Sequence, residues 1–216
     1  MKMYLKTARD PISSLTHFIG LVALVVGFVF ILAKGLYLNA TLAHFVSAII
    51  FSISAMLLYF ASAYYHYYKG DSKRIAWLRK FDHSMIYVLI AGSYTPMCVL
   101  CMEPNTAIRF GGFVWGIAIL GIIVKLCFMN VPRFVGTLLY LLMGWMVLLD
   151  WSSFSSLPSG CLLLVFLGGV AYSIGAFVYA LKWPTLNKNW SFHEIFHVFI
   201  MVGTLLHYLA VYFYVL

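Results

Sequence analysis

Charged side chains are scarce in this chain. Asp, Glu, Lys and Arg make up 9% of its 216 residues, whereas a typical soluble domain has about 25%. A soluble globule must cover its surface with polar and charged groups, so this composition excludes an ordinary soluble enzyme. The apolar content of 64% also excludes a disordered chain, because disordered chains contain few apolar residues.

Cysteine is scarce as well. The four cysteines, Cys98, Cys101, Cys127 and Cys161, all lie within or beside apolar runs, which is not the pattern of a small disulfide-stapled secreted domain. Cys98 and Cys101 form a C-x-x-C pair, but no second pair and no βαβ context accompanies it. We therefore interpret this pair as packing residues.

Long apolar runs dominate the sequence instead. A helix needs about 20 apolar residues to cross about 30 Å of hydrocarbon. Seven runs meet this requirement, at about residues 15–37, 42–65, 82–101, 109–129, 132–149, 161–181 and 192–214. They are continuous, unlike the alternating strands of an outer-membrane barrel. The sequence therefore predicts an all-α protein, with residues 1–216 forming a single seven-helix membrane domain. In the fourth run, Gly112-x3-Gly116 is typical of close helix packing.

The basic residues are distributed unequally between the two sides of these spans. If the N-terminus is cytoplasmic, 12 of the 14 Lys and Arg residues fall in cytoplasmic segments, and only Lys34 and Arg109 fall outside. The cytoplasmic ones are Lys2, Lys6, Arg9, Lys69, Lys73, Arg74, Arg79, Lys80, Lys125, Arg133, Lys182 and Lys188. The positive-inside rule then predicts a cytoplasmic N-terminus and an outside C-terminus. It also explains the net charge of +8 without a nucleic-acid partner.

Several polar residues of the spans are expected at one depth, near the cytoplasmic surface. His193 and His197 are spaced i, i+4 at the start of the seventh span, so they share a helix face. Ser62 and His66 have the same spacing at the end of the second span, and Asp82 begins the third. Three neutral imidazoles with an open fourth position are the ligands of a catalytic zinc site. A neighbouring carboxylate can hold or deprotonate the water bound there.

The remaining histidines leave alternatives open. His44 is expected near the outer surface as a polar anchor, and His207 is too deep in the seventh span to join the same ligands. His17 lies at the right depth to sit beside them. His83 either joins the site or faces the lipid headgroups.

The sequence His193-Glu194-Ile195-Phe196-His197 matches the H-E-x-x-H signature of zinc metalloproteases. In that interpretation Glu194 is the general base. The alternative is that Glu194 is an acidic residue at a helix N-terminus, where the helix dipole favours negative charge.

The pattern Ser62-x3-His66, then Asp82, then His193-x3-His197 resembles that of the bacterial hemolysin III-like proteins. These belong with the progestin and adipoQ receptors in a superfamily that includes the alkaline ceramidases. The resemblance implies a bacterial cell-membrane protein that binds Zn²⁺ through His66, His193 and His197 near the cytoplasmic face. Asp82 would contact the metal through a water, and Ser62 would sit beside the ligands or stabilise an oxyanion. Relatives are credited with hydrolysing lipid amides such as ceramide, and bacterial members carry a haemolytic label.

Four functions follow from these observations. The first is a zinc-dependent hydrolase of a membrane lipid amide, with no soluble protein partner. The second is a non-enzymatic, receptor-like or homeostatic membrane protein with a structural or regulatory zinc. The third, a pore-forming haemolysin, is disfavoured because a toxin must first exist in soluble form. The fourth is an intramembrane metalloprotease that uses Glu194. Three imidazoles suit zinc, although iron, nickel and copper also bind imidazole.

Overall fold

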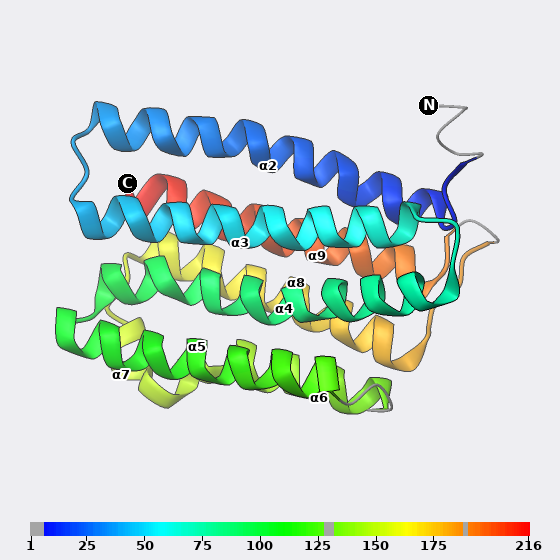
Figure 1. The fold of residues 1–216 in the computed structure, drawn as a ribbon. Coiled ribbons are helices and arrows are strands. Elements are labelled where there is room, and N and C mark those ends of the chain that lie inside the picture. Colours follow the sequence, from blue (N-terminus) through cyan, green and yellow to red (C-terminus); the bar gives the residue numbers. More distant parts are fainter. Residues whose placement is uncertain (1–6, 128–131, 188–189) are drawn as a thin grey trace.

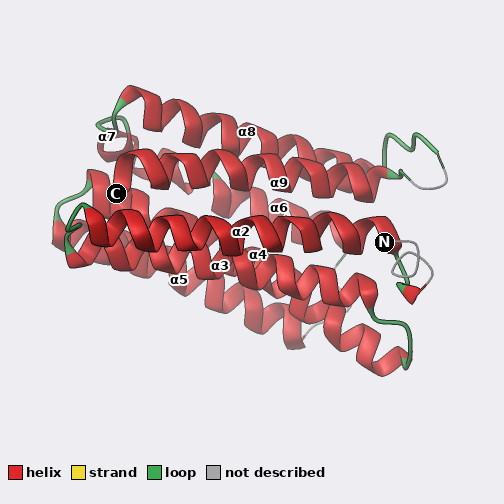
Figure 2. Cartoon of the chain, turned by 90° about the horizontal axis from the view of Figure 1, so that it is seen from above, coloured by secondary structure: helices red, strands yellow, loops and turns green. Residues whose placement is uncertain are grey.

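The computed structural model describes residues 7–127, 132–187 and 190–216. Within them, seven helices are long and apolar enough to cross a membrane, so the predicted all-α fold and its number of spans are confirmed. The elements are α2 (Pro11–Tyr37), α3 (Leu42–Tyr67), α4 (Ser72–Cys101), α5 (Pro104–Cys127), α6 (Arg133–Gly144), η1 (Met146–Asp150), α7 (Trp151–Phe154), α8 (Ser159–Leu181), α9 (Phe192–Ala210) and η2 (Val211–Val215). They form an elongated bundle of roughly parallel and antiparallel helices (Figures 1 and 2).

Helix α4 begins about three turns before the apolar run that predicts it. The Asp71 side chain accepts a hydrogen bond from the backbone N–H of Arg74, which caps the helix at this earlier point. Asp82 therefore lies in the third turn of α4 rather than at its start. The end of the predicted fourth span, residues 128 and 129, lies outside the described residues.

The predicted fifth span is interrupted rather than continuous. Helix α6 ends at Gly144, and the chain continues through the tighter turns of η1 into α7. The hydroxyl of Tyr94 on α4 bridges the break, donating to the Gly144 carbonyl at 2.7 Å and accepting from the Val147 N–H at 2.8 Å. A side chain from a neighbouring helix thus satisfies the backbone groups that the break releases, as hydrocarbon surroundings require.

Small residues set the closest helix contacts. Most buried residues of α3 are Ser or Ala, which lets α4 approach closely. A Cβ atom added at Gly92 on α4 would collide with Ser54 on α3. The expected Gly112-x3-Gly116 contact is wrong for the residues that the structure describes, because a Cβ at either glycine would meet nothing within 4 Å.

Large apolar side chains, among them Val29, Phe30, Leu120 and Phe177, are exposed along the outside of the bundle. Such a surface is unfavourable in water and suits lipid chains. Together with the seven long apolar helices, it describes a multi-pass membrane protein.

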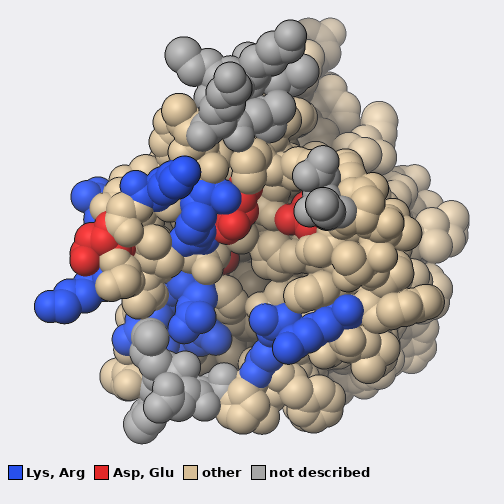
Figure 3. Space-filling model, turned by 90° about the vertical axis from the view of Figure 1, so that its right-hand side faces the viewer, with Lys and Arg blue, Asp and Glu red and all other residues tan. Residues whose placement is uncertain are grey.

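Most of the charge lies at one end of the bundle, which we call the basic end. Helices α2, α4, α6 and α9 begin there, and α3, α5 and α8 end there (Figure 1). Lys34, near the end of α2, and Arg109, near the start of α5, belong to the opposite end. Figure 3 views the basic end and shows Lys and Arg side chains around a hollow. Lys2, Lys6 and Lys188 lie outside the described residues. That this end faces the cytoplasm stays a prediction from the positive-inside rule.

Candidate metal centre

Three histidines from two helices meet at the basic end. His66 lies in the last turn of α3, and His193 and His197 lie in the first turns of α9. One ligand atom from each lies within 4.8 Å of the others, and His66 Nε2 is 3.1 Å from His193 Nε2. His66 and His197 are almost fully buried. The structure thus brings together the three residues that the sequence predicts as ligands.

Asp10 orients His66, and sequence reasoning missed it. Its carboxylate lies 2.9 Å from His66 Nδ1 and also accepts from the Arg9 guanidinium. The hydrogen bond to His66, followed by the charge and hydrogen bonds of Arg9, lowers the pKa of Asp10 to about 2. Because the ionised carboxylate can only accept, the proton lies on His66 Nδ1 and the lone pair on Nε2. That nitrogen is the one that faces His193.

Thr16 fixes the tautomer of His197 in a similar way. Its hydroxyl donates to the Ser13 carbonyl at 3.0 Å, and its oxygen lies 3.4 Å from His197 Nδ1. With its own hydrogen engaged, Thr16 can only accept, which places a proton on His197 Nδ1 and leaves the lone pair on Nε2. Two of the three imidazoles are therefore held in the tautomer that binds a metal through Nε2.

The donor set fits a zinc ion. Zn–N bonds of about 2.0–2.1 Å in tetrahedral geometry place ligand nitrogens about 3.3 Å apart. The His66–His193 separation of 3.1 Å is close to this value. Within the described residues, no fourth His, Cys, Asp or Glu joins the group. The arrangement therefore offers three neutral nitrogen ligands and leaves a position open.

Asp82 and Ser62 are buried and line the same cavity as His193 and His197. The Ser62 hydroxyl interacts with the Asp82 carboxylate, and Asp82 Oδ2 is 3.5 Å from His83 Nδ1. Asp82 is not part of the compact histidine group. Contact between Asp82 and a metal through a water stays a prediction.

The other histidines near this end have different surroundings. His17 stacks on His197 with ring centroids 3.7 Å apart, and among the described residues neither of its ring nitrogens has a hydrogen-bond partner. His83 Nδ1 donates to the Arg79 carbonyl at 2.7 Å. Deeper in α9, His207 Nε2 lies 3.2 Å from the Val165 carbonyl oxygen. None of these three histidines belongs to the compact ligand group, as far as the described residues go.

Glu194 caps a helix. Its carboxylate accepts from the Ser191 backbone N–H and hydroxyl at 2.9 and 2.6 Å, which completes a capping box at the start of α9. It also accepts from the Ser13 hydroxyl at 2.6 Å and so ties α2 to α9. These contacts correspond to the helix N-terminal role of Glu194.

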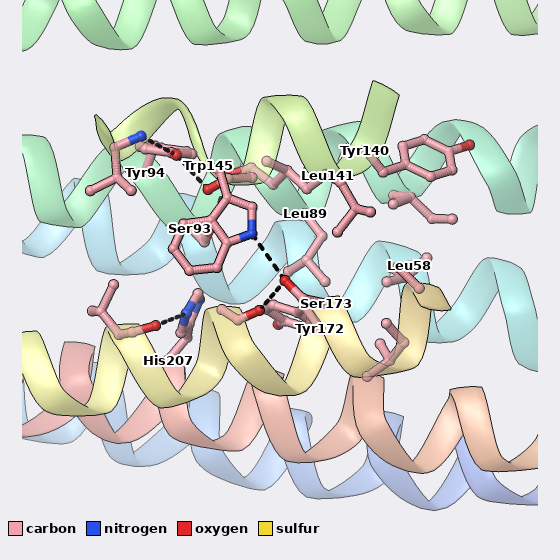
Figure 4. Close-up of a pocket in the computed structure, with 18 of the residues that line it drawn as sticks. Leu58, Leu89, Ser93, Tyr94, Tyr140, Leu141, Trp145, Tyr172, Ser173 and His207 are labelled. Carbon is pink, nitrogen blue, oxygen red and sulfur yellow. Dashed lines mark hydrogen bonds between the residues drawn. The ribbon is translucent and has the colours of Figure 1, made fainter. Parts of the chain in front are cut away.

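The histidine group lies between two cavities. A cavity of about 460 Å³, which we call the membrane cavity, runs along the bundle from Asp82 and His197 toward Trp151 and Val211. Its lining is mostly apolar. Figure 4 shows Trp145 reaching across it from the α6 break to Ser173 on α8, where its ring N–H donates to the hydroxyl at 3.0 Å. The second cavity, of about 550 Å³, lies at the basic end and is lined in part by Asp10, His66 and His193.

Comparison with known proteins gives the family. The family model described as "Haemolysin-III related" matches residues 5–208. The chain belongs to this family. The match covers Asp10, Ser62, Asp82 and the three clustered histidines.

Two curated relatives agree with the family model. The Hemolysin-3 homolog of Bacillus subtilis (strain 168) is 32% identical over 210 residues, which cover 96% of this chain and 95% of that protein. Hemolysin-3 of Bacillus cereus is 31% identical over 209 residues, covering 94% and 90% of the two chains. This member of the haemolysin-III-related family thus aligns with its relatives over nearly its whole length.

Proposed function

We propose that this chain is a zinc-dependent hydrolase that cleaves an amide bond of a membrane lipid. One observation carries the proposal: the group of three histidines leaves a position open, and two of its members, His193 and His197, line a membrane cavity that Asp82 and Ser62 also line. A buried carboxylate beside three imidazoles, opening toward a mostly apolar cavity, suits hydrolysis of a substrate that arrives from the bilayer.

Each residue has a defined task in this reaction. His66, His193 and His197 hold the metal, which when bound polarises a carbonyl and lowers the pKa of water toward about 7. Asp82 accepts the proton that the attacking water loses and passes it to the amide nitrogen as the C–N bond breaks. The Ser62 hydroxyl interacts with the Asp82 carboxylate, and because it carries one proton it donates either to Asp82 or to the developing oxyanion. Asp10 and Thr16 keep two of the imidazoles in their binding tautomers.

The membrane cavity receives the acyl chain. Its volume of about 460 Å³ lies within the range of about 300–1,000 Å³ typical of ligand pockets. Leu89, Leu162 and Phe166 contribute apolar walls beyond the polar end. With the carbonyl beside the histidines, the chain extends toward the opposite end of the bundle.

The open position favours an enzyme over a protein with a structural zinc, because structural sites close with four protein ligands. The capping contacts of Glu194 likewise favour Asp82 over Glu194 as the base. A metalloprotease would respond in the opposite way, with Glu194→Gln abolishing activity and Asp82→Asn leaving it intact.

Release of fatty acid from a panel of amide lipids, ceramide included, tests the proposal on zinc-loaded protein in mild detergent. Asp82→Asn is expected to lower the rate by about 10²–10⁴, the usual contribution of a general base. The matched control is Asp150→Asn, at an α7 cap where Asn is also accepted. The proposal fails if the parent cleaves none of the panel, or if Asp82→Asn is as active as Asp150→Asn.

A further inference from the structure

The second cavity is rich in positive charge. Its lining includes Arg79 and Lys80 from α4, Lys125 from α5 and Arg133 from α6. We call this cavity of about 550 Å³ the basic vestibule. Figure 3 shows Lys and Arg side chains gathered around the hollow at this end of the molecule.

The acids of the chain leave these cations unpaired. All six Asp and Glu residues lie in the described part of the chain, and none of them is within ion-pair distance of the four cations. Two acids also line the vestibule, but Asp10 is engaged by Arg9 and His66, and Glu194 by Ser13 and Ser191. The vestibule therefore has an excess of positive charge.

Not all four cations are equally available. Lys80 Nζ donates to the Leu126 carbonyl at 2.6 Å, and the Arg133 guanidinium lies over the Tyr179 ring at 4.6 Å. Arg79 is exposed and Lys125 half-buried, and the side chain of neither forms a hydrogen bond or ring contact with the described residues. These two side chains are the best placed to bind a ligand.

The positive-inside rule does not explain this arrangement. That rule accounts for cations at one end of the bundle, and Lys69, Lys73 and Lys182 satisfy it without lining either cavity. Cations that converge on one recess repel each other and concentrate the field there, which favours an anion. Convergence from three helices is therefore a separate observation from net charge.

The vestibule adjoins the membrane cavity at the histidine group. The two cavities share His83, Thr137, Tyr140, Tyr179 and His193 as lining residues. A molecule that placed a scissile bond beside the histidines would therefore have a mostly apolar space on one side and a basic space on the other.

We propose that the basic vestibule binds an anionic oxygen group, a carboxylate or phosphate, carried by the same amphiphile whose acyl chain occupies the membrane cavity. This inference rests on the proposed function and narrows its substrate class to acyl amides with an anionic polar group. The planar guanidinium of Arg79 can donate hydrogen bonds to two oxygens of the anionic group, and the ammonium group of Lys125 adds a second positive charge.

A matched pair of probes tests the inference by binding alone. N-hexadecanoylglycine carries a carboxylate, and N-hexadecanoylglycinamide is its neutral counterpart with the same chain. Native mass spectrometry of the zinc-loaded protein counts the intact bound amphiphile, so the result does not depend on turnover. We expect the carboxylate to bind about tenfold more tightly or better, equivalent to about 1.4 kcal/mol.

Variants test whether the preference for the carboxylate probe arises in the basic vestibule. Arg79→Gln/Lys125→Gln is expected to bind both probes equally within about twofold, whereas the control Lys69→Gln/Lys73→Gln, with the same change of charge, keeps the preference. Arg79→Gln alone, at an exposed position, is expected to lower the preference for the carboxylate probe about threefold. This single variant replaces the double variant in the comparison if the double variant does not fold.

Three results would overturn the inference. In the first, the parent would bind both probes equally. In the second, the Arg79→Gln/Lys125→Gln variant would keep the preference for the carboxylate probe because the carboxylate contacts the metal instead. In the third, inorganic phosphate alone would bind as tightly as the anionic probe, which would make the vestibule a site for free anions. If the protein prefers the carboxylate probe but cleaves no amide, the inference about the basic vestibule stands and the proposed hydrolysis fails.

Discussion

Asp10 precedes the first span, yet its carboxylate reaches His66 at the end of the second, 2.9 Å from Nδ1. Its backbone N–H also donates to the His66 carbonyl at 2.9 Å, so the segment is held against α3 by two contacts. A carboxylate on the far nitrogen of a ligating histidine fixes the ring and raises the basicity of the ligating nitrogen.

Asp10→Asn is therefore expected to weaken zinc binding by about 10–100-fold, the usual effect of losing such a partner. Competition with a zinc-chelating dye measures the affinity. Asp71→Asn is the matched control, because Asn caps a helix as well as Asp does and Asp71 only caps α4. Equal affinities of the two variants would contradict the role given to Asp10.

The sequence predicts the clustered histidines better than the groups that orient them. The i, i+4 spacing of His193 and His197 and the order of the spans are enough to bring both to the level of His66. Asp10 and Thr16 reach their histidines through the docking of α2 on α3 and α9. No spacing rule encodes that contact, although an ionisable residue directly before a membrane span was a usable signal.

Single helices show where an apolar run is a poor guide. Residues 72–81 include four Lys and Arg residues and lie outside the predicted apolar run, but the Asp71 cap starts α4 there. Conversely, the apolar stretch 144–149 predicts a continuous helix, and the chain breaks it at Gly144 because Tyr94 binds the released backbone groups. A local cap decides the first case and a tertiary contact the second.

Helix contacts give a second prediction. Gly92→Val is expected to destabilise the protein by about 1–3 kcal/mol, the usual cost of overpacking a tight interface, because its side chain would push against Ser54 on α3. Thermal unfolding in detergent measures the difference. Gly112→Val is the control, since its Cβ meets nothing within 4 Å. A Gly92→Val variant as stable as this control would show that α3 and α4 are not closely packed at Ser54.

At the scale of the whole molecule, the distribution of Lys and Arg predicts orientation as well as fold. The structure collects the described cations, apart from Lys34 and Arg109, at the end that holds the histidine group. If the positive-inside rule applies, the metal site and the basic vestibule face the cytoplasm.

Cysteine labelling in intact bacteria checks this orientation. In a background without native cysteines, Asn105→Cys, at the opposite end, is expected to react with a membrane-impermeant maleimide. Lys69→Cys, at the basic end, is expected to react only after lysis. Both positions are exposed, so accessibility within the fold does not differ. The reverse pattern would contradict the predicted orientation and move the site to the outer face.

The most direct test of the central claim is the metal content of the purified protein, measured by plasma mass spectrometry. The comparison is a His66→Ala/His193→Ala/His197→Ala variant whose helical content matches that of the parent. We predict about one zinc per chain in the parent, from the one three-ligand group found among the described residues, and none in the variant. A parent that binds no metal even when zinc is supplied would contradict the account, and the histidines would then be buried polar groups.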